Sequence, residues 1–453
     1  MLTLPDVHEG IDGSLIAAGG PTEKTFRQAS IDSRTVKPDD LFFAVRGERV
    51  DGHDFVNDAI SAGAAGAVVE RPLDIQNNAA MIHVDDSLVA LQKLAGYWRH
   101  RHDVRIVAVT GSVGKTTCKE MIAAVLSERH NMLKSEANLN TEIGIPLTLL
   151  GLSTEHEHAA LEFGMYARGD IALLCDLASP QVGVVTNIGP VHLERLGSMG
   201  AITAAKAELV ESLPKDGLAV LNGDDPRTAA LANRTPARAV LYGRSSQCDV
   251  RATEIQSHGL DGFTFRLTQG GSAVGVRCPL PGVHNVYPAL AAAAVALNDG
   301  MTLSEIAAAL ASSRPDLRLR TVPGPNGSTI IDDSYNASPA AMIAALDLLA
   351  ELPGRRLALL GEMRELGQAE FESHQRVGER AATACDILYV IGERAAPLAA
   401  AASAKGIKIV HSLTSPEAAV GALRSELRQG DYLLVKASRA LALETVVEAL
   451  CQS

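Results

Sequence analysis

Residues 106–117 read IVAVTGSVGKTT, in which the apolar run Ile106–Val109 leads directly into a loop containing Gly111 and Gly114. Two glycines let the backbone curl so that successive N–H groups point inward at an anion. The helix predicted over 116–127 would aim its positive N-terminal end at the same anion. This succession of strand, glycine loop and helix predicts a site that holds a nucleoside triphosphate by its phosphates.

The residues inside the loop fit phosphate binding in type and order. Lys115 would reach the β- and γ-phosphates, and the Thr116 hydroxyl would ligate Mg²⁺. Val109 stands where the usual motif begins with a glycine, but the flanking strand and helix patterns favour the phosphate site over an ordinary tight turn. The residues expected to contact ATP are Thr110, Gly111, Ser112, Val113, Gly114, Lys115, Thr116 and Thr117.

Length and composition predict an enzyme of several domains. A chain of 453 residues is too long for one core, so two to four domains are expected. Apolar residues make up 47% of the chain, enough to fill packed cores. Aromatic residues make up only 4%, a content that suits closely packed layers of helices on sheets. A net charge of −12 argues against a nucleic-acid-binding surface, although a local basic site could still bind anionic substrates.

Cysteine usage and the N-terminus predict a cytoplasmic protein. The six cysteines show no CxxC pair and are expected to be buried, reduced thiols. Acidic residues occupy the N-terminus where a signal peptide would be basic and then apolar. The alanine-rich stretch 289–297 is too short for a membrane span and is expected to form a packed helix. We therefore expect no membrane insertion.

The fold class expected is α/β with three domains. Residues 1–84 mix short strands, including one at 65–69, with a helix at 53–62, and residues 85–314 begin with a helix over 87–98. The central part should hold a mostly parallel sheet and a hairpin of 263–267 with 274–278. Residues 315–453 should form a Rossmann-like doubly wound sheet after a turn at 323–327. Further strands are predicted at 159–163, 182–186, 218–221, 330–331, 356–360, 387–391, 407–410 and 432–435.

Polar residues follow several of these strands, where α/β folds place ligands. Glu162 ends one strand and could be a Mg²⁺ ligand beside Thr116, because hard cations prefer oxygen. His192 follows the next strand, and a structural role is as plausible for a lone histidine. Lys206 lies on a predicted helix and by itself would be a solvated lysine. Two further segments, 332–336 and 436–439, also follow strands, and the second is expected to open a helix.

Taken together, these motifs resemble the Mur ligases, ATP-dependent amide-bond-forming enzymes of peptidoglycan synthesis. The resemblance covers essentially the whole chain and rests on TGSVGKTT, NIGPVHLE at 187–194, Lys206, His284-Asn285 and DDSYNASP at 332–339. Four segments resemble the members of the family that add D-alanyl-D-alanine to UDP-N-acetylmuramoyl-tripeptide. They are the stretch 32–53, the segment 138–146, GEMRELG at 361–367 and KASR at 436–439. The sister enzyme that adds the third residue of the peptide usually carries an Asn-Pro-Arg signature in its C-terminal domain, and this sequence lacks it.

The resemblance implies a role for each matching residue. Thr116 and Glu162 would hold one Mg²⁺, and His192 and Lys206 a second. In the family this lysine is carbamylated by CO₂, which turns a cation into a carboxylate-like ligand. Lys115, His192 and Lys206 are the implied catalytic residues. Asn285 would contact adenine, Arg318 a phosphate and Asp333 the ribose. The implied substrate-binding residues are Ser33, Arg34, Gly47, Asp51, His53, Asn138, Asn140, Asn336, Lys436, Ser438 and Arg439.

The implied chemistry is formation of an acyl phosphate followed by attack of an amine, in a monomer whose three domains close around the substrates.

Three other functions stay open. The chain could be a ligase for another amino substrate, such as a sister Mur ligase or a folylpolyglutamate synthetase, a nucleotide-hydrolysing switch, or a non-catalytic nucleotide-binding module. The third residue of the acceptor peptide, lysine or diaminopimelate, is not encoded in any motif recognised here.

Overall fold

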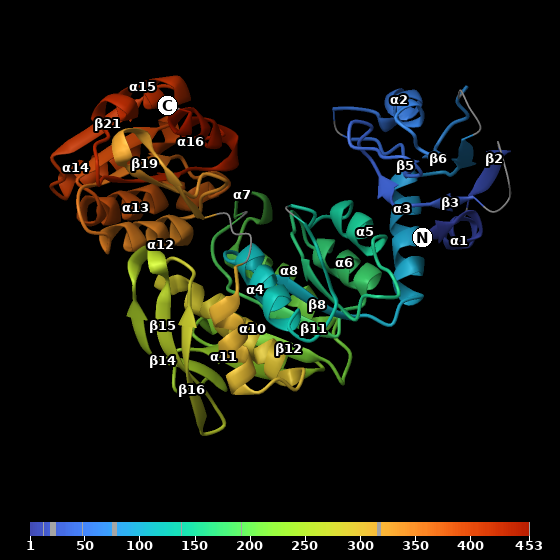
Figure 1. Cartoon of the computed structure of the whole chain (residues 1–453), viewed down its shortest axis with the longest axis horizontal. Helices are drawn as coiled ribbons and strands as arrows, with labels where there is room; N and C mark the ends of the chain where they lie inside the picture. Colours follow the sequence, from blue (N-terminus) through green and yellow to red (C-terminus); the bar gives the residue numbers. More distant parts are fainter. Residues whose placement is uncertain are drawn as a thin grey trace.

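The computed structural model describes residues 1–11, 13–18, 24–47, 49–74, 79–136, 138–191, 193–314 and 319–452. Within these ranges the chain folds as an α/β protein on three large, mostly parallel sheets that follow one another along the sequence. Figure 1 shows the N-terminal domain in blue and the C-terminal domain in orange and red on opposite sides of the central domain. The expected three-domain α/β architecture is confirmed.

The N-terminal sheet has the order β2-β7-β6-β5-β4 and is parallel except for β2, which pairs antiparallel with β7. All residues of β5 are buried, because α2 covers Phe42 on one face while α1 and α3 cover its neighbours on the other. The elements are β1 (Leu2–Thr3), α1 (Leu4–Gly10), β2 (Ser14–Ala18), β3 (Thr25–Phe26), β4 (Ala29–Ser30), β5 (Leu41–Phe43), α2 (Val56–Ser61), β6 (Gly66–Val69), β7 (Ala80–His83) and α3 (Ser87–His100).

The central sheet has the order β16-β15-β14-β13-β12-β11-β8-β10-β9, parallel from β9 to β14 and antiparallel through β15 and β16. Its strands are β8 (Arg105–Thr110), β9 (Met132–Lys134), β10 (His158–Glu162), β11 (Val182–Val185), β12 (Leu218–Asn222), β13 (Arg238–Gly243), β14 (Val250–Ser257), β15 (Phe263–Gln269) and β16 (Ser272–Cys278). Its helices are α4 (Lys115–Leu126), α5 (Gly144–Leu149), α6 (Asp170–Ala178), α7 (Leu193–Leu196), α8 (Met199–Glu211), α9 (Pro226–Ala229), α10 (Val286–Asn298) and α11 (Leu303–Ser312).

The C-terminal sheet has the order β17-β18-β22-β19-β20-β21, with β17 antiparallel and the other strands parallel. This is the expected doubly wound arrangement. The strands are β17 (Arg320–Pro323), β18 (Thr329–Asp332), β19 (Arg356–Gly361), β20 (Ile387–Ile391), β21 (Ile409–Leu413) and β22 (Tyr432–Lys436), and the helices are α12 (Pro339–Ala350), α13 (Glu370–Ala384), α14 (Ala396–Ala404), α15 (Pro416–Glu426) and α16 (Glu444–Cys451).

Helix α3 joins the N-terminal domain to the central domain. Its buried face, which includes Leu91 and Leu94, belongs to one apolar cluster that extends from β5 to the helices beside the central sheet. Trp98 at its end donates a hydrogen bond of 3.0 Å to the carbonyl of Leu152. The C-terminal domain, by contrast, has apolar clusters on the two faces of its sheet, and Leu260 is the one described apolar residue of the central domain that packs against them. The first two domains are therefore joined by a shared core.

Some expectations were wrong in detail. The helix at 53–62 is a 3₁₀ turn, Gly52–Phe55, followed by α2, and the strand at 407–410 begins two residues later. The segment 436–439 opens only a 3₁₀ turn at Arg439–Leu441, and α16 begins at Glu444, because Ala442 adopts a left-handed φ of 47° that interrupts the helix. All six cysteines are free, but Cys248 is half-buried and Cys451 is exposed. No described helix has the length and apolar character needed to span a membrane.

Candidate functional site

A cavity with a volume of about 1000 Å³ lies where the central and C-terminal domains face each other. The glycine loop lines it from the central domain, and segments after β18 and β22 line it from the C-terminal domain. The expected site residues that line it are Gly111, Ser112, Val113, Gly114, Lys115, Thr116, Thr117, Asn138, Asn140, Glu162, Lys206, Asn285, Asp333, Asn336, Lys436, Ser438 and Arg439. Thr110 lies beneath the loop, buried, and donates a hydrogen bond to the carbonyl of Phe163 at 2.9 Å.

The two glycines of the loop are required for different reasons. Gly111 has φ +148°, and a Cβ there would lie 1.9 Å from Oγ1 of Thr186. Gly114 has φ +81° and is the N-cap of α4, and no described atom would lie within 4 Å of a Cβ placed on it. Because glycine offers no side chain to cap α4, the first N–H groups of the helix face the cavity without a capping side chain. The loop therefore presents backbone donors and open space to an anion.

A second loop after β11 holds the glycine loop in shape. The side-chain oxygen of Asn187 accepts a hydrogen bond of 3.0 Å from the backbone N–H of Val113, and Thr186 donates one of 2.7 Å to the Val113 carbonyl. Ser112 donates to the carbonyl of Gly189 at 3.1 Å. Both loops follow neighbouring parallel strands, so their polar groups meet at one edge of the sheet.

Thr116 and Glu162 lie together at this edge. The Thr116 hydroxyl donates a hydrogen bond of 2.7 Å to Oε2 of Glu162, and the Asn140 amide donates one of 2.9 Å to Oε1. The backbone N–H of Glu162 donates to the hydroxyl of Ser135 at 3.0 Å, and the buried Lys119 donates to the carbonyl of Ser135. A buried carboxylate beside a hydroxyl is the oxygen-rich arrangement that Mg²⁺ prefers.

Two lysines share one carbonyl in the loop. Nζ of Lys115 donates to the Gly111 carbonyl at 3.1 Å, and Nζ of Lys206 donates to the same oxygen at 2.9 Å. Lys206 comes from α8 and is 2% exposed. Burial, and secondarily the charge of Lys115, holds the pKa of Lys206 well below its usual range. The sequence alone suggested a solvated lysine, and the structure places this amine in the wall of the cavity.

The C-terminal wall is organised by an ion pair. Lys436, at the end of β22, is 2.5 Å from Oδ2 of Asp333 and donates to the carbonyl of Asn336 at 2.9 Å. The guanidinium of Arg439 lies 5.4 Å from the ring centre of Tyr335. Across the cavity, buried Asn285 donates to the carbonyl of Pro281 at 2.8 Å. The expected nucleotide and dipeptide contacts of both domains thus face one space.

The expected contacts in the N-terminal domain form a separate group. Ser33, Arg34, Gly47, Asp51 and His53 are absent from the described lining of the cavity. Arg34 is largely exposed and pairs with Asp32 at 2.7 Å. His53 is buried, with Nδ1 2.6 Å from Asp51 and Nε2 accepting a hydrogen bond of 2.9 Å from the N–H of Glu70. Both ring nitrogens therefore orient the loop around Asp51. Two further expected residues, His192 and Arg318, lie outside the described residues.

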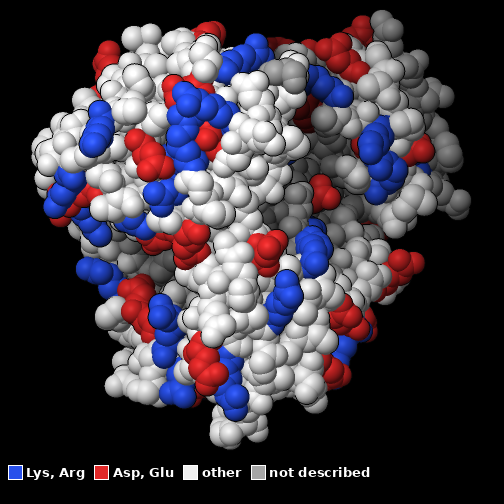
Figure 2. Space-filling view, turned by 60° about the vertical axis from the view of Figure 1, so that its left-hand side comes forward, with Lys and Arg blue, Asp and Glu red and all other residues white. Residues whose placement is uncertain are grey.

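Several cavity residues were not assigned to the site from the sequence, although His284 and the segment 361–367 belong to motifs that carried the resemblance. Tyr287 donates a hydrogen bond of 3.1 Å to Asp224, and burial lowers the pKa of His284. The segment 364–366 enters the lining from the loop after β19. The sequence indicated this segment by its position after a predicted strand and by the stretch GEMRELG, but it gave no role to residues 364–366. On the outer surface, lysines and arginines are interspersed with carboxylates over the face that Figure 2 shows.

Comparison with known proteins agrees with this arrangement. Three family models match: the Mur ligase middle domain over residues 109–296, the Mur ligase glutamate ligase domain over 317–439, and the Mur ligase family catalytic domain over 25–99. A curated UDP-N-acetylmuramoyl-tripeptide–D-alanyl-D-alanine ligase from Synechocystis sp. is 39% identical over 99% of this chain and 97% of its own. MurF from Acinetobacter baumannii has a crystal structure that aligns with a TM-score of 0.88 at 30% identity, covering 100% of this chain and 99% of that chain. The crystal structure of MurF ligase from Thermotoga maritima in complex with ADP gives a TM-score of 0.81 at 30% identity, over 94% and 97%. The chain therefore belongs to the Mur ligase family.

Proposed function

We propose that this chain joins D-alanyl-D-alanine to UDP-N-acetylmuramoyl-tripeptide with cleavage of ATP to ADP and phosphate, a step of peptidoglycan precursor synthesis. The observation that carries the proposal is one cavity in which a phosphate-binding loop faces a lysine- and arginine-bearing wall from another domain. Near-full-length identity to relatives named for this reaction supports it. A protein that only switches between nucleotide states would not need a wall of the cavity that holds a second substrate.

ATP would lie along the glycine loop. The N–H groups at the start of α4 and Lys115 would bind its phosphates, because backbone donors and a cation together stabilise the charge that develops during phosphoryl transfer. Asn285 and Asp333 would contact the adenine and the ribose, and both line the cavity. The phosphate contact expected of Arg318 rests on the resemblance alone.

The oxygen ligands fit Mg²⁺. Thr116 and Glu162 offer a hydroxyl and a carboxylate 2.7 Å apart, and Asn140 orients the carboxylate. Bound there, the ion would offset negative charge on the transferring phosphoryl group. A second Mg²⁺ would use His192 and carbamylated Lys206. The lowered pKa of Lys206 supports this, because only an uncharged amine can add CO₂.

The residues of the cavity then have a defined chemical task. A carboxylate is a poor acyl donor, so its oxygen must first take the γ-phosphoryl group of ATP and become an acyl phosphate. The free amine of D-alanyl-D-alanine attacks that carbonyl, and phosphate leaves as the amide forms. Lys436, Ser438 and Arg439 would hold the dipeptide and the peptide carboxylate in this geometry. The walls must also exclude water, which would hydrolyse the acyl phosphate.

The other end of the acceptor would lie in the N-terminal domain. Ser33 and Arg34 would bind the uridine diphosphate, since an exposed guanidinium matches phosphate oxygens. The path from the uridine diphosphate to the reacting carboxylate would be completed by Gly47, Asp51, His53, Asn138, Asn140 and Asn336. We further propose that the protein acts as a monomer in the cytoplasm, where the nucleotide-linked precursor would be made.

Phosphate release from Mg-ATP, with mass detection of product, tests the proposal. The assay would contain D-alanyl-D-alanine and UDP-N-acetylmuramoyl-tripeptide in its lysine or diaminopimelate form, and each component would be omitted in turn. We expect release only when all three substrates are present, together with a pentapeptide product, and the active form would identify the third residue. Release with ATP alone would favour a nucleotide switch. Activity with single amino acids but not the dipeptide would favour a sister ligase.

A further inference from the structure

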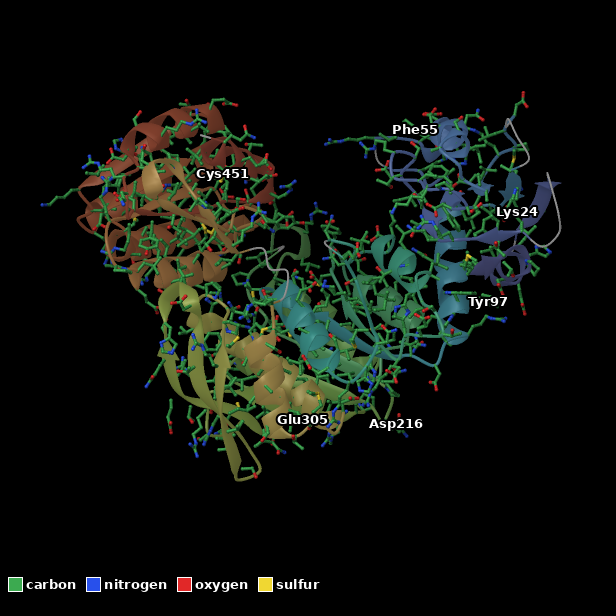
Figure 3. All side chains as sticks on the ribbon, in the orientation of Figure 1. Lys24, Phe55, Tyr97, Asp216, Glu305 and Cys451 are labelled. Carbon is green, nitrogen blue, oxygen red and sulfur yellow. The ribbon has the colours of Figure 1, made fainter. Side chains whose placement is uncertain are left out.

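The described part of the chain contains one group of histidine and carboxylate side chains close enough to share a metal ion, His130, His158 and Asp299. None of the three lines the nucleotide cavity. His130 precedes β9, His158 begins β10 and Asp299 follows α10. The two histidines lie at the N-terminal ends of parallel strands, whereas the glycine loop follows the C-terminal end of β8. Glu305, which pairs with neighbouring Arg129, is labelled low on the central domain in Figure 3.

Both imidazoles converge on one carboxylate. Nε2 of His130 is 2.6 Å from Oδ2 of Asp299, and Nε2 of His158 is 3.0 Å from Oδ1. The two rings lie 4.0 Å apart between their centres. His158 is only 7% exposed. The three candidate ligand atoms lie within 4.8 Å of one another, so they surround a common point.

Two ring nitrogens of this group have no hydrogen-bond partner among the described residues. If both Nε2 atoms donate to Asp299, each neutral ring has a lone pair on Nδ1. Nδ1 of His130 and Nδ1 of His158 are buried and have no hydrogen-bond partner among the described residues. For His130 that lone pair would also face Oε2 of Glu157 at 3.6 Å, an unfavourable contact. Metal binding through Nε2 would move the proton to Nδ1, and His130 could then donate to Glu157 in the arrangement that orients metal-bound histidines.

The local charge also favours a cation. Asp299 and Glu157 supply two carboxylates at this position, and Arg105 supplies one guanidinium, 3.5 Å from Oδ1 of Asp299. The Arg105 side chain is 37% exposed and can turn toward solvent when a metal takes its place. Nearby Arg129 is already paired with Glu305 at 2.5 Å. A divalent ion would therefore enter a site with excess negative charge.

We propose that His130, His158 and Asp299 form a binding site for a divalent transition metal of the zinc class, with water as the fourth ligand. Two imidazoles and a carboxylate are a ligand set of zinc, nickel and cobalt sites, whereas Mg²⁺ prefers oxygen alone. Metal–nitrogen distances of about 2.0 Å place tetrahedral ligands roughly 3.3 Å apart, so each Nε2 needs to move away from the Asp299 oxygen that it contacts by less than about 1 Å. The ion would fasten the ends of β9, β10 and α10 to one another as a structural site.

Cobalt binding to the full-length, metal-stripped protein tests the proposal. Co²⁺ is titrated in the presence of excess Mg²⁺, which occupies the oxygen ligands of Thr116 and Glu162. We expect one equivalent to give the intense visible absorption of four-coordinate Co²⁺ and Zn²⁺ to abolish it. Zn²⁺ should also raise the melting temperature. Absence of this absorption, or an octahedral spectrum alone, would overturn the proposal.

Three variants assign the ion to the site. Asp299→Asn and His130→Gln should weaken Co²⁺ binding at least about tenfold, and His130 is exposed enough for its variant to fold. His156→Gln removes a histidine near the same edge of the sheet whose Nδ1 contacts Ser153 instead, and it should bind Co²⁺ like the unmodified protein. An unchanged spectrum in both His130→Gln and Asp299→Asn would place the ion elsewhere and refute the assignment.

Discussion

At the scale of single residues, the two glycines of the phosphate loop should fail in different ways when replaced. A Cβ at Gly114 meets open space but adds the strain of a left-handed backbone, about 1–2 kcal/mol, and projects where a phosphate must approach the N–H groups. We expect Gly114→Ala to lower stability slightly and to raise KM for ATP at least about tenfold. Gly111→Ala should instead reduce the yield of folded protein, because its Cβ would overlap Thr186.

Gly430→Ala is the matched control for this pair. Gly430 has φ +82°, nearly that of Gly114, and no described atom would contact its Cβ within 4 Å. It does not belong to the described lining of the cavity. The melting temperature of each of the three variants measures the cost of backbone strain, and steady-state kinetics measure damage to the phosphate site. An equal rise in KM for Gly430→Ala and Gly114→Ala would show that strain alone accounts for the effect.

Lys206 offers a test of the second-metal proposal at the same scale. Lys206→Ala should be nearly inactive, because it removes the group that would become a carbamate ligand. Short carboxylic acids added to the assay should restore part of the turnover by supplying a carboxylate in its place. The full-length variant should retain its melting temperature within a few degrees. Near-normal turnover without added acid would contradict the role of this residue.

His284 should make stability depend on pH. Burial is the main cause of its lowered pKa, and the charges of Asp333, Lys436 and Asp347 contribute less. The unfolded chain therefore takes up this proton first on acidification, so the stabilisation is complete above pH 6.5 and is lost as the pH falls through the lower folded pKa. We expect the fall in melting temperature from pH 7.5 to 5.5 to be smaller in His284→Asn. The exposed His100→Asn serves as control, and equal falls in all three proteins would contradict the prediction.

At the scale of elements, helix α3 is held by one buried arginine. Arg99 donates to the carbonyl of Ala178 at 2.8 Å, to that of His102 at 2.9 Å and to that of Val104 at 2.8 Å. Arg99→Met keeps the apolar stem but leaves three carbonyls without their donor. Since each unsatisfied group costs about 1–3 kcal/mol, we expect a loss of about 3 kcal/mol or more.

Thermal and denaturant unfolding would measure this loss. Arg101→Met, at the residue directly after α3, removes a half-exposed guanidinium whose nearest acidic partners are 3.9 Å away, and it should cost less than about 1 kcal/mol. Comparable losses in the two variants would show that the helix end depends on charge rather than on the three buried carbonyls.

The elements also show what sequence patterns can and cannot predict. Buried parallel strands such as β11 and β20 are continuous apolar runs, and they were located within one residue. Strand β14 was missed because polar or charged residues alternate with apolar ones along it, and the short apolar run of the partly buried β13 was missed as well. In the site, the individual segments were identified from their positions at strand ends. The pairing of Asp333 with Lys436 was not predicted, because the two residues are 103 positions apart in the sequence and meet only through the order of the strands in the sheet.

At the scale of the whole molecule, the distribution of apolar contacts determines which domain can move. The N-terminal and central domains share one apolar cluster through α3, so separating them would expose a continuous core. Contacts of the central domain with the C-terminal domain include polar ones, such as the N–H of Glu194 to the carbonyl of Glu365 at 3.4 Å and Ser257 with Glu351. The substrates of the proposed reaction span all three domains. Closure should therefore move the C-terminal domain against the other two.

Distances between spin labels can detect this motion, using the positions labelled in Figure 3. Cys451 is exposed in the C-terminal domain, and Phe55→Cys and Asp216→Cys provide sites in the other two, once half-buried Cys248 is replaced by serine. With a non-hydrolysable ATP analogue and the UDP-linked tripeptide, we expect the distance from 451 to 216 to change and that from 55 to 216 to stay constant. Ligands should have no effect in Lys115→Ala, which weakens the phosphate site. If only the distance from 55 to 216 changed, the N-terminal domain would move against the central domain despite their shared core around α3. Buried apolar area would then not decide which domain moves.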